Sequence, residues 1–400
     1  MLYPVHTFIS LRSTNFRHYF IGHSLSTLGT WIQQVTLAWL IYNLTGSPAL
    51  LGIIGFCALI PQLFISPLAG AWIDKLNKQK LLVIIQILFF IQTISLGLCY
   101  RWDVFTPNIL VAMSLSLGIL TAIDTPLRQS LLSLIVEDKT ILPNALALNA
   151  MIFNASRFVG PPIAGLLLSI IGAEMCFYIN AFSYLCLGIA VARMKGVTSQ
   201  KASGHVGHVF IEGLKYMYHK PEFRLLMCTV IVLNLTASSY VTLLPIYAKD
   251  IIAGNEQTLG ILWGFAGIGS LLSSLRLASR KDFKDHKHLF ALNIGCCAFG
   301  LLLLGITQDM AILCGAMFLL GFGISTSNIL TNIIIQNATV ESLRGRAISI
   351  YTSTRFGFDA LGGLIVGLVA AIFMPQYIMI LYSLILASYL ILFTRIKPQS

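Results

Sequence analysis

Charged side chains inside otherwise apolar stretches are the residues of this chain best suited to chemistry. Arg157, Arg355 and Asp359 each lie deep in such a stretch, and the two arginines would create a positive site for a carboxylate or phenolate. Asp359 follows Arg355 by four residues, on the same face of a helix, and could carry a proton. A charge at membrane depth costs at least about 2.5–3.5 kcal/mol, which favours a functional role. The alternative is a self-neutralising structural ion pair between Arg355 and Asp359.

A second group of charges lies nearer to one end of its helix. Asp124 and Arg128 are four residues apart on one helical face, at the depth expected for Asp74 and Lys78 in the loop between the second and third apolar stretches. Together the four charges could form a latch between two halves of the molecule, which is a gating role. The alternative is a local pair between Asp124 and Arg128, worth about 0.5 kcal/mol.

Long membrane-crossing helices are needed to position these charges. A bilayer core requires roughly 20 apolar residues per helix. This 400-residue chain is 56% hydrophobic and 10% charged, against about 25% charged in a soluble domain. Twelve stretches are long enough, at residues 18–43, 47–72, 79–101, 107–135, 143–171, 173–194, 223–248, 257–279, 287–307, 310–336, 343–373 and 376–395. The sequence therefore predicts an all-α integral membrane protein with twelve transmembrane helices.

The basic residues behind the net charge of +11 are concentrated in the loops on one side of the predicted membrane. Among the basic residues in the predicted loops, only Arg101 and Lys249 fall on the side opposite the N-terminus. This asymmetry is typical of the positive-inside rule, so both termini are predicted in the cytoplasm, at a bacterial inner membrane. It explains the basic charge without an acidic partner, and no nucleic-acid partner is expected. The start of the chain shows no signal-peptide cleavage site, so the first stretch is predicted to be a true span.

The cysteines and the known catalytic motifs offer no alternative chemistry. All eight cysteines fall inside predicted helices, and none has the spacing of a metal site. We therefore expect packing residues, with no disulfide, no metal and no cofactor. The chain also lacks the H-E-x-x-H, G-x-S-x-G and G-x4-G-K-[ST] patterns, so an enzyme or a nucleotide-driven motor is not predicted.

Three parts of the chain are predicted from its polarity. Residues 1–194 and residues 223–400 each hold six of the predicted helices. The polar residues 195–222 separate them as a cytoplasmic loop. Within this loop, Phe210, Leu214 and Met217 have the spacing of a short amphipathic helix on the membrane surface. A structureless linker is the alternative.

The two halves also repeat each other in sequence. Residues 156–165 (SRFVGPPIAG) and 354–363 (TRFGFDALGG) align at an offset of 198 residues, which makes Arg157 and Arg355 coincide. Six-plus-six repeats of this kind form two pseudo-symmetric six-helix bundles in transporters. Cargo and coupling ions then bind near the membrane midplane, between the two bundles.

Two motifs in the first half concern helix packing and gating. The loop after the second stretch reads G-x3-D-K-x2-K-x-K from Gly70, where the glycine permits close helix approach and Asp74 can cap a helix N-terminus. The fifth stretch contains Gly160, Pro161 and Gly165, so a bent helix with tight packing is expected there. For the loop, the alternative is an ordinary basic loop that happens to contain one acid. For the fifth stretch, the alternative is a plain proline kink.

These motifs resemble those of a known family. The loop from Gly70 resembles the signature loop of the major facilitator superfamily, and the segment from Gly160 resembles its antiporter motif, with Ala164 replacing one glycine. GTWIQQVTLAWLIYNLTGSP in the first stretch and RGRAISIYTSTRFG in the eleventh are similar to the siderophore-exporter branch, which includes enterobactin exporters and drug-efflux relatives. The resemblance implies that Asp74 contacts the start of the eleventh helix, where Arg346 lies. Arg355 and Asp359 depart from the branch, which usually has apolar residues there.

The resemblance implies a function. We expect a monomeric secondary transporter that exports a small anionic or amphipathic molecule, such as a siderophore or a drug, in exchange for protons and by alternating access. Membrane lipid is then the surrounding partner. Gln33 and Gln34 are further candidates for contacts with cargo, although they point to different faces of one helix, so at most one should line a cavity. An importer, a lysophospholipid flippase or a transporter-like sensor stays open as the alternative.

Overall fold

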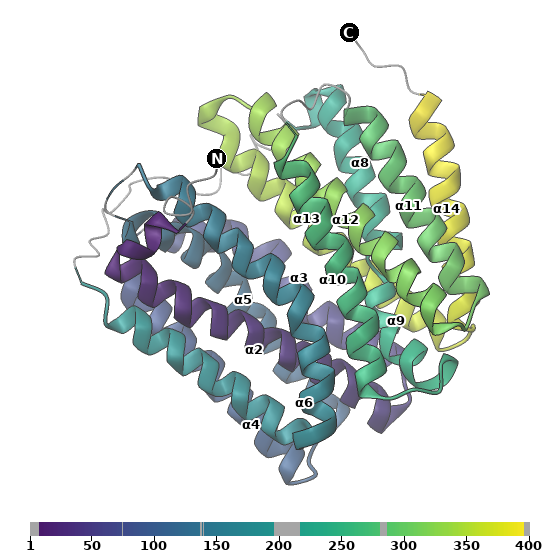
Figure 1. Ribbon diagram of the computed structural model, residues 1–400, viewed down its shortest axis with the longest axis horizontal. Helices are drawn as coiled ribbons and strands as arrows, with labels where there is room; N and C mark the ends of the chain where they lie inside the picture. The colour runs from purple at the N-terminus through teal and green to yellow at the C-terminus, as the bar shows by residue number, and fades with distance from the viewer. Residues whose placement is uncertain are drawn as a thin grey trace.

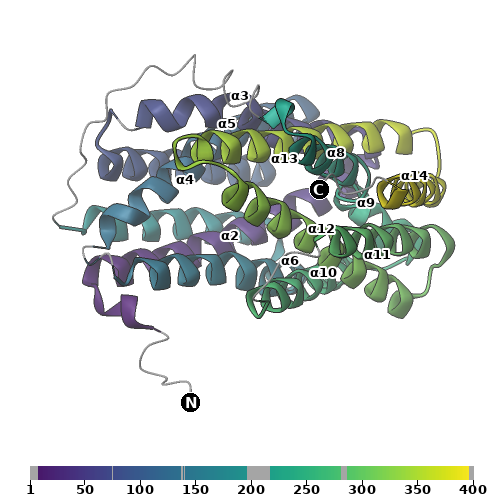
Figure 2. The ribbon, with the colours of Figure 1, turned by 90° about the horizontal axis from the view of Figure 1, so that it is seen from above.

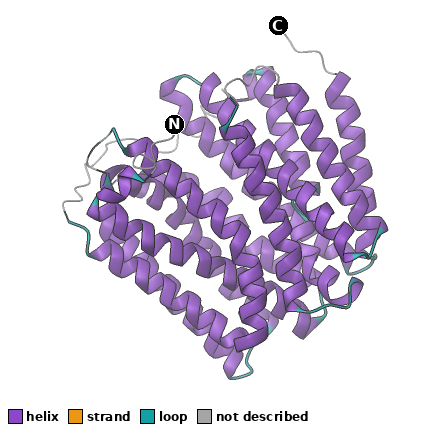
Figure 3. Ribbon diagram, viewed as in Figure 1, coloured by secondary structure: helices purple, strands orange, loops and turns teal. Residues whose placement is uncertain are grey.

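The computed structural model describes residues 8–73, 75–136, 138, 140–195, 217–280 and 286–395, apart from the side chains of residues 67, 70, 71, 341 and 342. Within those ranges the regular structure is entirely helical (Figure 3), which confirms the expected all-α class. Most of the predicted loop at residues 195–222, including the expected amphipathic helix from Phe210, lies outside the described residues.

The helices lie close to the predicted positions. In chain order they are η1 (Ile9–Arg12), α2 (Thr14–Thr45), α3 (Pro48–Ile73), α4 (Lys78–Arg101), α5 (Pro107–Ile135), α6 (Leu142–Ala192), α8 (Pro221–Thr236), α9 (Tyr240–Ile246), η2 (Tyr247–Ile251), α10 (Glu256–Ala278), α11 (His286–Ile306), α12 (Met310–Ala338), α13 (Glu341–Ala370) and α14 (Pro375–Arg395). Their apolar length explains this agreement, because each must bury its backbone hydrogen bonds within a bilayer.

The described helices supply all twelve predicted crossings. Ten candidate spans are long and apolar enough to cross a membrane. One of them, α6, has 51 residues and is broken at Gly172, where φ is +78°. Glycine tolerates this left-handed conformation, so α6 contains two crossing segments, as predicted. The twelfth segment is α2, which at 32 residues is long enough to cross but is too polar to be among the ten.

The seventh predicted crossing, residues 223–248, is interrupted, which corrects the expectation of one continuous helix. α8 ends at Thr236, α9 begins at Tyr240, and the π-helix η2 follows directly. Pro245 within α9 has no backbone N–H to donate, which favours irregular helical geometry around it. The three segments still form one span of 31 residues.

The helices form two groups that meet along their long sides (Figures 1 and 2). We call α2–α6 the N-bundle and α8–α14 the C-bundle. Between the bundles, α3 packs against α13 and α6 packs against α10. Glycines allow this close approach. A Cβ at Gly52 in α3 would lie 2.8 Å from the carbonyl oxygen of Gly363 in α13, and one at Gly165 in α6 would lie 2.6 Å from that of Glu256 in α10.

Among the described residues, the buried apolar cluster that joins the two bundles lies at one end. We call the end where α2 begins and α14 ends the terminal face, and the opposite end the far face. One buried cluster runs through the C-bundle and into the far half of the N-bundle, where it includes Ile41 and Leu51. A separate cluster, with Phe16, Leu82 and Leu131 among its members, lies in the terminal half of the N-bundle and holds residues of that bundle alone. The described bundles are therefore closed at the far face and divided at the terminal face.

Candidate functional site

Three charged side chains come together where the bundles adjoin. Arg157 on α6 interacts electrostatically with Arg355 and Asp359 on α13. It also interacts with Tyr240, a buried residue of α9. The three charged residues are half-buried, and the backbone of Arg157 packs against Gly267 of α10. The two arginines predicted for cargo binding and the aspartate predicted for proton coupling thus share one region between the bundles.

Arg355 and Asp359 do not form the ion pair that was one expectation from their spacing. Among the ion pairs of the described residues, none includes Asp359. Instead, the guanidinium of Arg355 lies over the ring of Phe356, 4.4 Å from its centroid. This cation–π contact positions the guanidinium without neutralising its charge. The carboxylate of Asp359 is therefore left without a direct ion-pair partner among the described residues.

A small cavity adjoins Arg355 on the C-bundle side. It has a volume of about 240 Å³ and is lined by Asn328, Ile329, Asn332, Ile333, Tyr351 and Arg355. The first four belong to α12, and the other two belong to α13. The asparagines were not among the residues singled out from the sequence, because amides in an apolar helix carry little signal before their neighbours are known.

Gln33 and Gln34 lie on different sides of α2. Gln33 is buried in the N-bundle, where its Oε1 accepts hydrogen bonds from Thr93 (3.0 Å) and Asn180 (2.5 Å). In this conformation Gln33 is therefore outside the region that cargo would reach, contrary to the expectation that it contacts cargo. Gln34 is exposed and lies within about one turn of Trp31, whose ring packs edge-on against Trp263 of the C-bundle. Gln34 thus remains a candidate for the cavity surface.

Asp124 and Arg128 form a buried pair inside the N-bundle. Arg128 donates through Nε to Asp124 (2.5 Å) and through Nη1 to Nδ1 of His23 (2.6 Å). Gln86 donates to the other oxygen of Asp124 (3.0 Å). The local pair expected from the spacing is therefore present. Its hydrogen-bonding partners come from α2 and α4 of the same bundle, not from the C-bundle.

Removing one member of this pair should destabilise the protein. Asp124→Leu would leave the Arg128 guanidinium buried without a counter-charge, which typically costs about 3–5 kcal/mol. We expect a clear fall in the melting temperature of the purified protein in detergent. Because the cost comes from the unpaired charge, Asp124→Leu combined with Arg128→Leu should recover most of the loss. A double variant as unstable as the single one would contradict this explanation.

The segment from Gly160 to Gly165 builds the contacts of α6 on both of its sides. A Cβ at Gly160 would lie 2.6 Å from Cβ of Trp31 in α2, and one at Gly260 in α10 would lie 2.6 Å from the carbonyl oxygen of Pro161. Gly165 faces α10 as well. These small residues and prolines therefore position α6 against both its own bundle and the C-bundle, which places Arg157 one to two turns along the same helix.

Polar contacts complete the closure at the far face. Tyr42 of α2 donates a hydrogen bond to Asp250 of η2, and the ammonium of Lys249 lies 5.7 Å from the Tyr42 ring centroid. Lys249 also donates to the carbonyl oxygen of Asn43 (3.3 Å). The irregular end of the seventh crossing thus carries the charged residues that join the two bundles here. Nothing in the sequence alone indicated this pairing.

The predicted gating residues of the signature-like loop lie at the terminal face, as far as they are described. Asp74 falls outside the described residues, and Gly70 is part of α3, although its surroundings are not described. Lys78 is the first residue of α4 and is half-buried, and Arg346 is half-buried in the second turn of α13. The predicted contact between Asp74 and the start of α13 therefore stays a prediction.

Comparison with known proteins agrees with this architecture. The sequence profile described as "transmembrane secretion effector" matches residues 5–399. The chain belongs to this family of the major facilitator superfamily. As a member of a transporter family, it is a transporter and not an enzyme, as the motifs predicted.

The relatives of this family member include transporters of two kinds. It is 29% identical to the staphyloferrin A transporter of Staphylococcus aureus, over 89% of this chain and 90% of that protein. It is 23% identical to the multidrug efflux pump Tap of Mycolicibacterium fortuitum, over 85% of each chain. The resemblance to siderophore and drug-efflux transporters is thereby confirmed.

Solved structures share the fold. A point mutant of the nucleoside transporter NupG superposes with a TM-score of 0.77 at 16% identity, covering 95% of this chain and 100% of that one. A bacterial homologue of the human lysosomal transporter Spinster gives a TM-score of 0.76 at 14% identity, covering 96% and 97%. These likenesses establish the fold.

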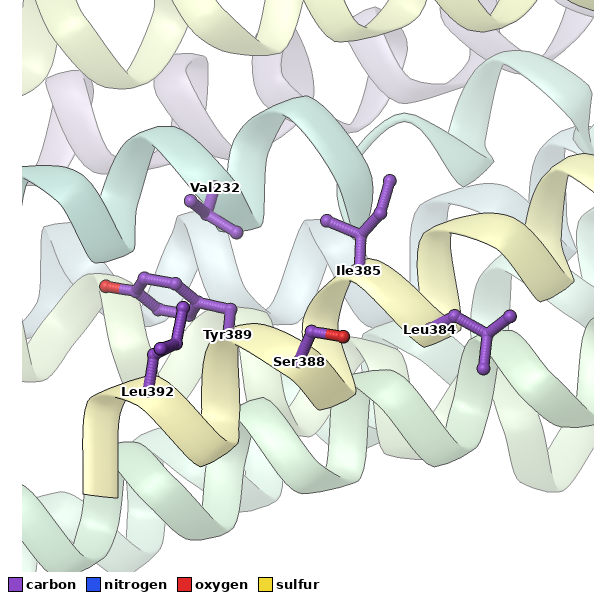
Figure 4. A pocket seen from close by; sticks show the side chains of 6 residues that line it. All are labelled: Val232, Leu384, Ile385, Ser388, Tyr389 and Leu392. Carbon is purple, nitrogen blue, oxygen red and sulfur yellow. The ribbon is translucent and has the colours of Figure 1, made fainter. Parts of the chain in front are cut away.

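A larger hollow lies away from the central charges, on the outer side of the C-bundle. It has a volume of about 380 Å³. Its lining consists of Ser388 and of five apolar or aromatic residues from α14 and the neighbouring helix α8 (Figure 4). Leu384 and Leu392 are each more than half exposed. An apolar groove between two helices at the rim of a transmembrane bundle is expected to face lipid chains, so we do not assign it to cargo.

Proposed function

We propose that this transporter exports a small anionic or amphipathic molecule in exchange for protons. The observation that carries the proposal is the meeting of Arg157, Arg355 and Asp359 between the bundles, where no ion pair among the described residues neutralises Asp359. The division of the bundles at the terminal face supports access to this region from that side. The outward direction is supported by the description of the family and by the efflux relatives.

Exchange requires that cargo and proton compete for one group. An ionised Asp359 can accept a hydrogen bond from a hydroxyl or ammonium group of the cargo, while the arginines hold an anionic group of the same molecule. Protonation of Asp359 removes both its charge and its strongest accepting site. The cargo is then released on the side where protons enter. A cargo with both an acidic group and a donor group therefore fits proton exchange.

The same three charges favour a second candidate function, proton-coupled uptake, if the cargo is purely anionic. Protonation of Asp359 leaves the two arginines as the only charges of the three, which strengthens the binding of an anion. Proton and cargo would then move together, and uptake driven by the proton gradient would follow. The pH dependence of binding separates the two: acidification should release an exported cargo and tighten the binding of an imported one.

The membrane placement completes the proposal. We infer a bacterial inner membrane with both termini in the cytoplasm, because the basic loops lie on the side of the N-terminus. The terminal face, where the apolar clusters of the two bundles are separate, is then the cytoplasmic face. A monomer is sufficient, since one chain supplies both bundles. The gating role of Gly70, Asp74, Lys78 and Arg346 at this face is part of the proposal, and Asp124 with Arg128 would stabilise the N-bundle beside them.

Arg157 provides the direct test of the anion site. Small molecules that accumulate inside a deletion strain, measured by mass spectrometry, identify the cargo, and its binding to the purified protein is then measured. Arg157→Ala should weaken binding roughly tenfold to hundredfold, since a hydrogen bond to a charged group contributes about 1.5–3 kcal/mol. Arg193→Ala, an exposed arginine at the end of α6, is the matched control and should leave affinity unchanged. Equal affinities for both variants would exclude the role of Arg157.

A further inference from the structure

The cavity between α12 and α13 has the chemistry of an anion-binding subsite. Among the residues that the structure describes, its lining combines one arginine, two asparagines and one tyrosine with two isoleucines and includes no acidic residue. A pocket with cationic and amide donors and no acid favours an anion over a cation. Both asparagines and Arg355 line the cavity and are partly accessible.

Hydrogen bonds already fix several of the lining groups. Gln336, one turn along α12, donates to the side-chain oxygen of Asn332, which leaves the amide N–H groups of Asn332 as donors. The hydroxyl of Tyr351 donates to the backbone carbonyl oxygen of Asn328 (2.8 Å), which joins α13 to α12 across the cavity. Together with the stacking of Arg355 on Phe356, these contacts hold donors in place before a ligand arrives. Preorganised donors bind an anion without a further ordering cost.

The size of the cavity limits what it can hold. Sites for drug-sized ligands have volumes of about 300–1,000 Å³, whereas this cavity has about 240 Å³. It can therefore hold one end of a larger molecule. Ile329 and Ile333 provide an apolar wall for the carbon skeleton next to the anionic group. Asp359, one turn beyond Arg355 on α13, is close enough to meet the remainder of the molecule.

We propose that this cavity binds a carboxylate end of the cargo, through Arg355, Asn328 and Asn332, while the rest of the molecule extends between the bundles toward Arg157. The proposal rests on the proposed function only for the identity of the ligand as cargo. The same chemistry would also bind the acidic headgroup of a membrane lipid, so the test must separate the two sources.

A simple aromatic hydroxy acid is a suitable probe. Binding of 4-hydroxybenzoate to the purified full-length transporter in phosphatidylcholine nanodiscs is measured by saturation-transfer NMR, beside its neutral isostere 4-hydroxybenzamide. We expect the acid to bind and the amide to bind at least tenfold more weakly. Arg355→Gln and Asn332→Leu should each raise the Kd of the acid at least tenfold. Asn337→Leu, an exposed asparagine of the same helix outside the cavity, should not change it.

The outcomes separate the subsite from the function. Equal binding of acid and amide, or an unchanged Kd in both Arg355→Gln and Asn332→Leu, would overturn the subsite. Loss of the acid signal when phosphatidylglycerol replaces phosphatidylcholine would assign the cavity to a lipid headgroup and overturn its assignment to cargo. Failure of proton-driven transport in liposomes, with the binding results as expected, would reject the proposed function and leave the carboxylate subsite standing.

Discussion

Asp359→Asn should abolish cargo movement driven by a proton gradient while leaving the folded transporter able to exchange cargo for cargo. Asparagine has nearly the same shape as aspartate and retains a hydrogen-bond acceptor, but it cannot take up a proton. The half-buried position of Asp359, near Arg157 and Arg355 and outside any ion pair of the described residues, makes it the acid on which coupling should depend. Proton-driven flux should therefore fall to the level of empty liposomes.

The measurement uses liposomes in two modes. In the first, a pH gradient drives flux, which Asp359→Asn should lose. In the second, unlabelled cargo on one side exchanges with labelled cargo on the other without a gradient, which the variant should retain. The control for both modes is Asp103→Asn. Asp103 is an exposed acid that follows α4, and asparagine also tolerates the positive φ found at this position. Undiminished gradient-driven flux through Asp359→Asn would exclude Asp359 as the proton carrier.

Gly52→Ala should also slow the transport cycle, for a steric reason. The added methyl group would lie 2.8 Å from the carbonyl oxygen of Gly363 and 3.1 Å from Cα of Gly367, both of them backbone atoms that cannot rotate away. Overpacking of this kind typically costs about 1–3 kcal/mol. The clash exists only while α3 and α13 are in contact at the far face. It should therefore shift the equilibrium away from the closed far face by roughly fivefold to a hundredfold.

Gly55→Ala is the matched control on the same helix, because a Cβ at Gly55 meets no atom within 4 Å. The readout is the rate of transport, together with labelling at the far face of Tyr42→Cys, in a variant whose native cysteines are replaced by serine. Tyr42 of α2 is buried and donates to Asp250 of η2 across this face, so its exposure reports on the separation of the bundles. Gly52→Ala should transport more slowly and label faster than Gly55→Ala. Identical behaviour of the two variants would show that the α3–α13 contact does not separate during transport.

Most of the helices could be predicted from the sequence because the bilayer sets their length. The predicted ends lie within about four residues of those observed, and even the break in α6 falls at Gly172, between the two predicted segments. The prediction for the seventh crossing was wrong in detail. Its interruption between Thr236 and Tyr240 and its π-helical end depend on local backbone geometry, which apolar length does not report.

The site could be predicted only in part. The spacing of Asp124 and Arg128 indicated their pairing, because neighbours four apart on a helix are fixed by local geometry. Their partners His23 and Gln86 come from other helices, and one sequence does not state which helices adjoin. For the same reason Gln33 was assigned to the cargo region although it faces Asn180. Arg355 and Asp359 have the same spacing as the first pair, yet the ring of Phe356 takes the guanidinium instead.

The polarity of α2 has a consequence for how the protein is made. The Oε1 of its buried Gln33 accepts hydrogen bonds from Thr93 and Asn180, which are synthesised 60 and 147 residues later. When this helix first leaves the ribosome and enters the insertion machinery, neither partner exists. An unpaired amide is costly in lipid. We therefore expect stable integration of the first helix to wait until the chain has been translated beyond residue 180, so that this half of the protein assembles as a unit during biogenesis and not one helix at a time.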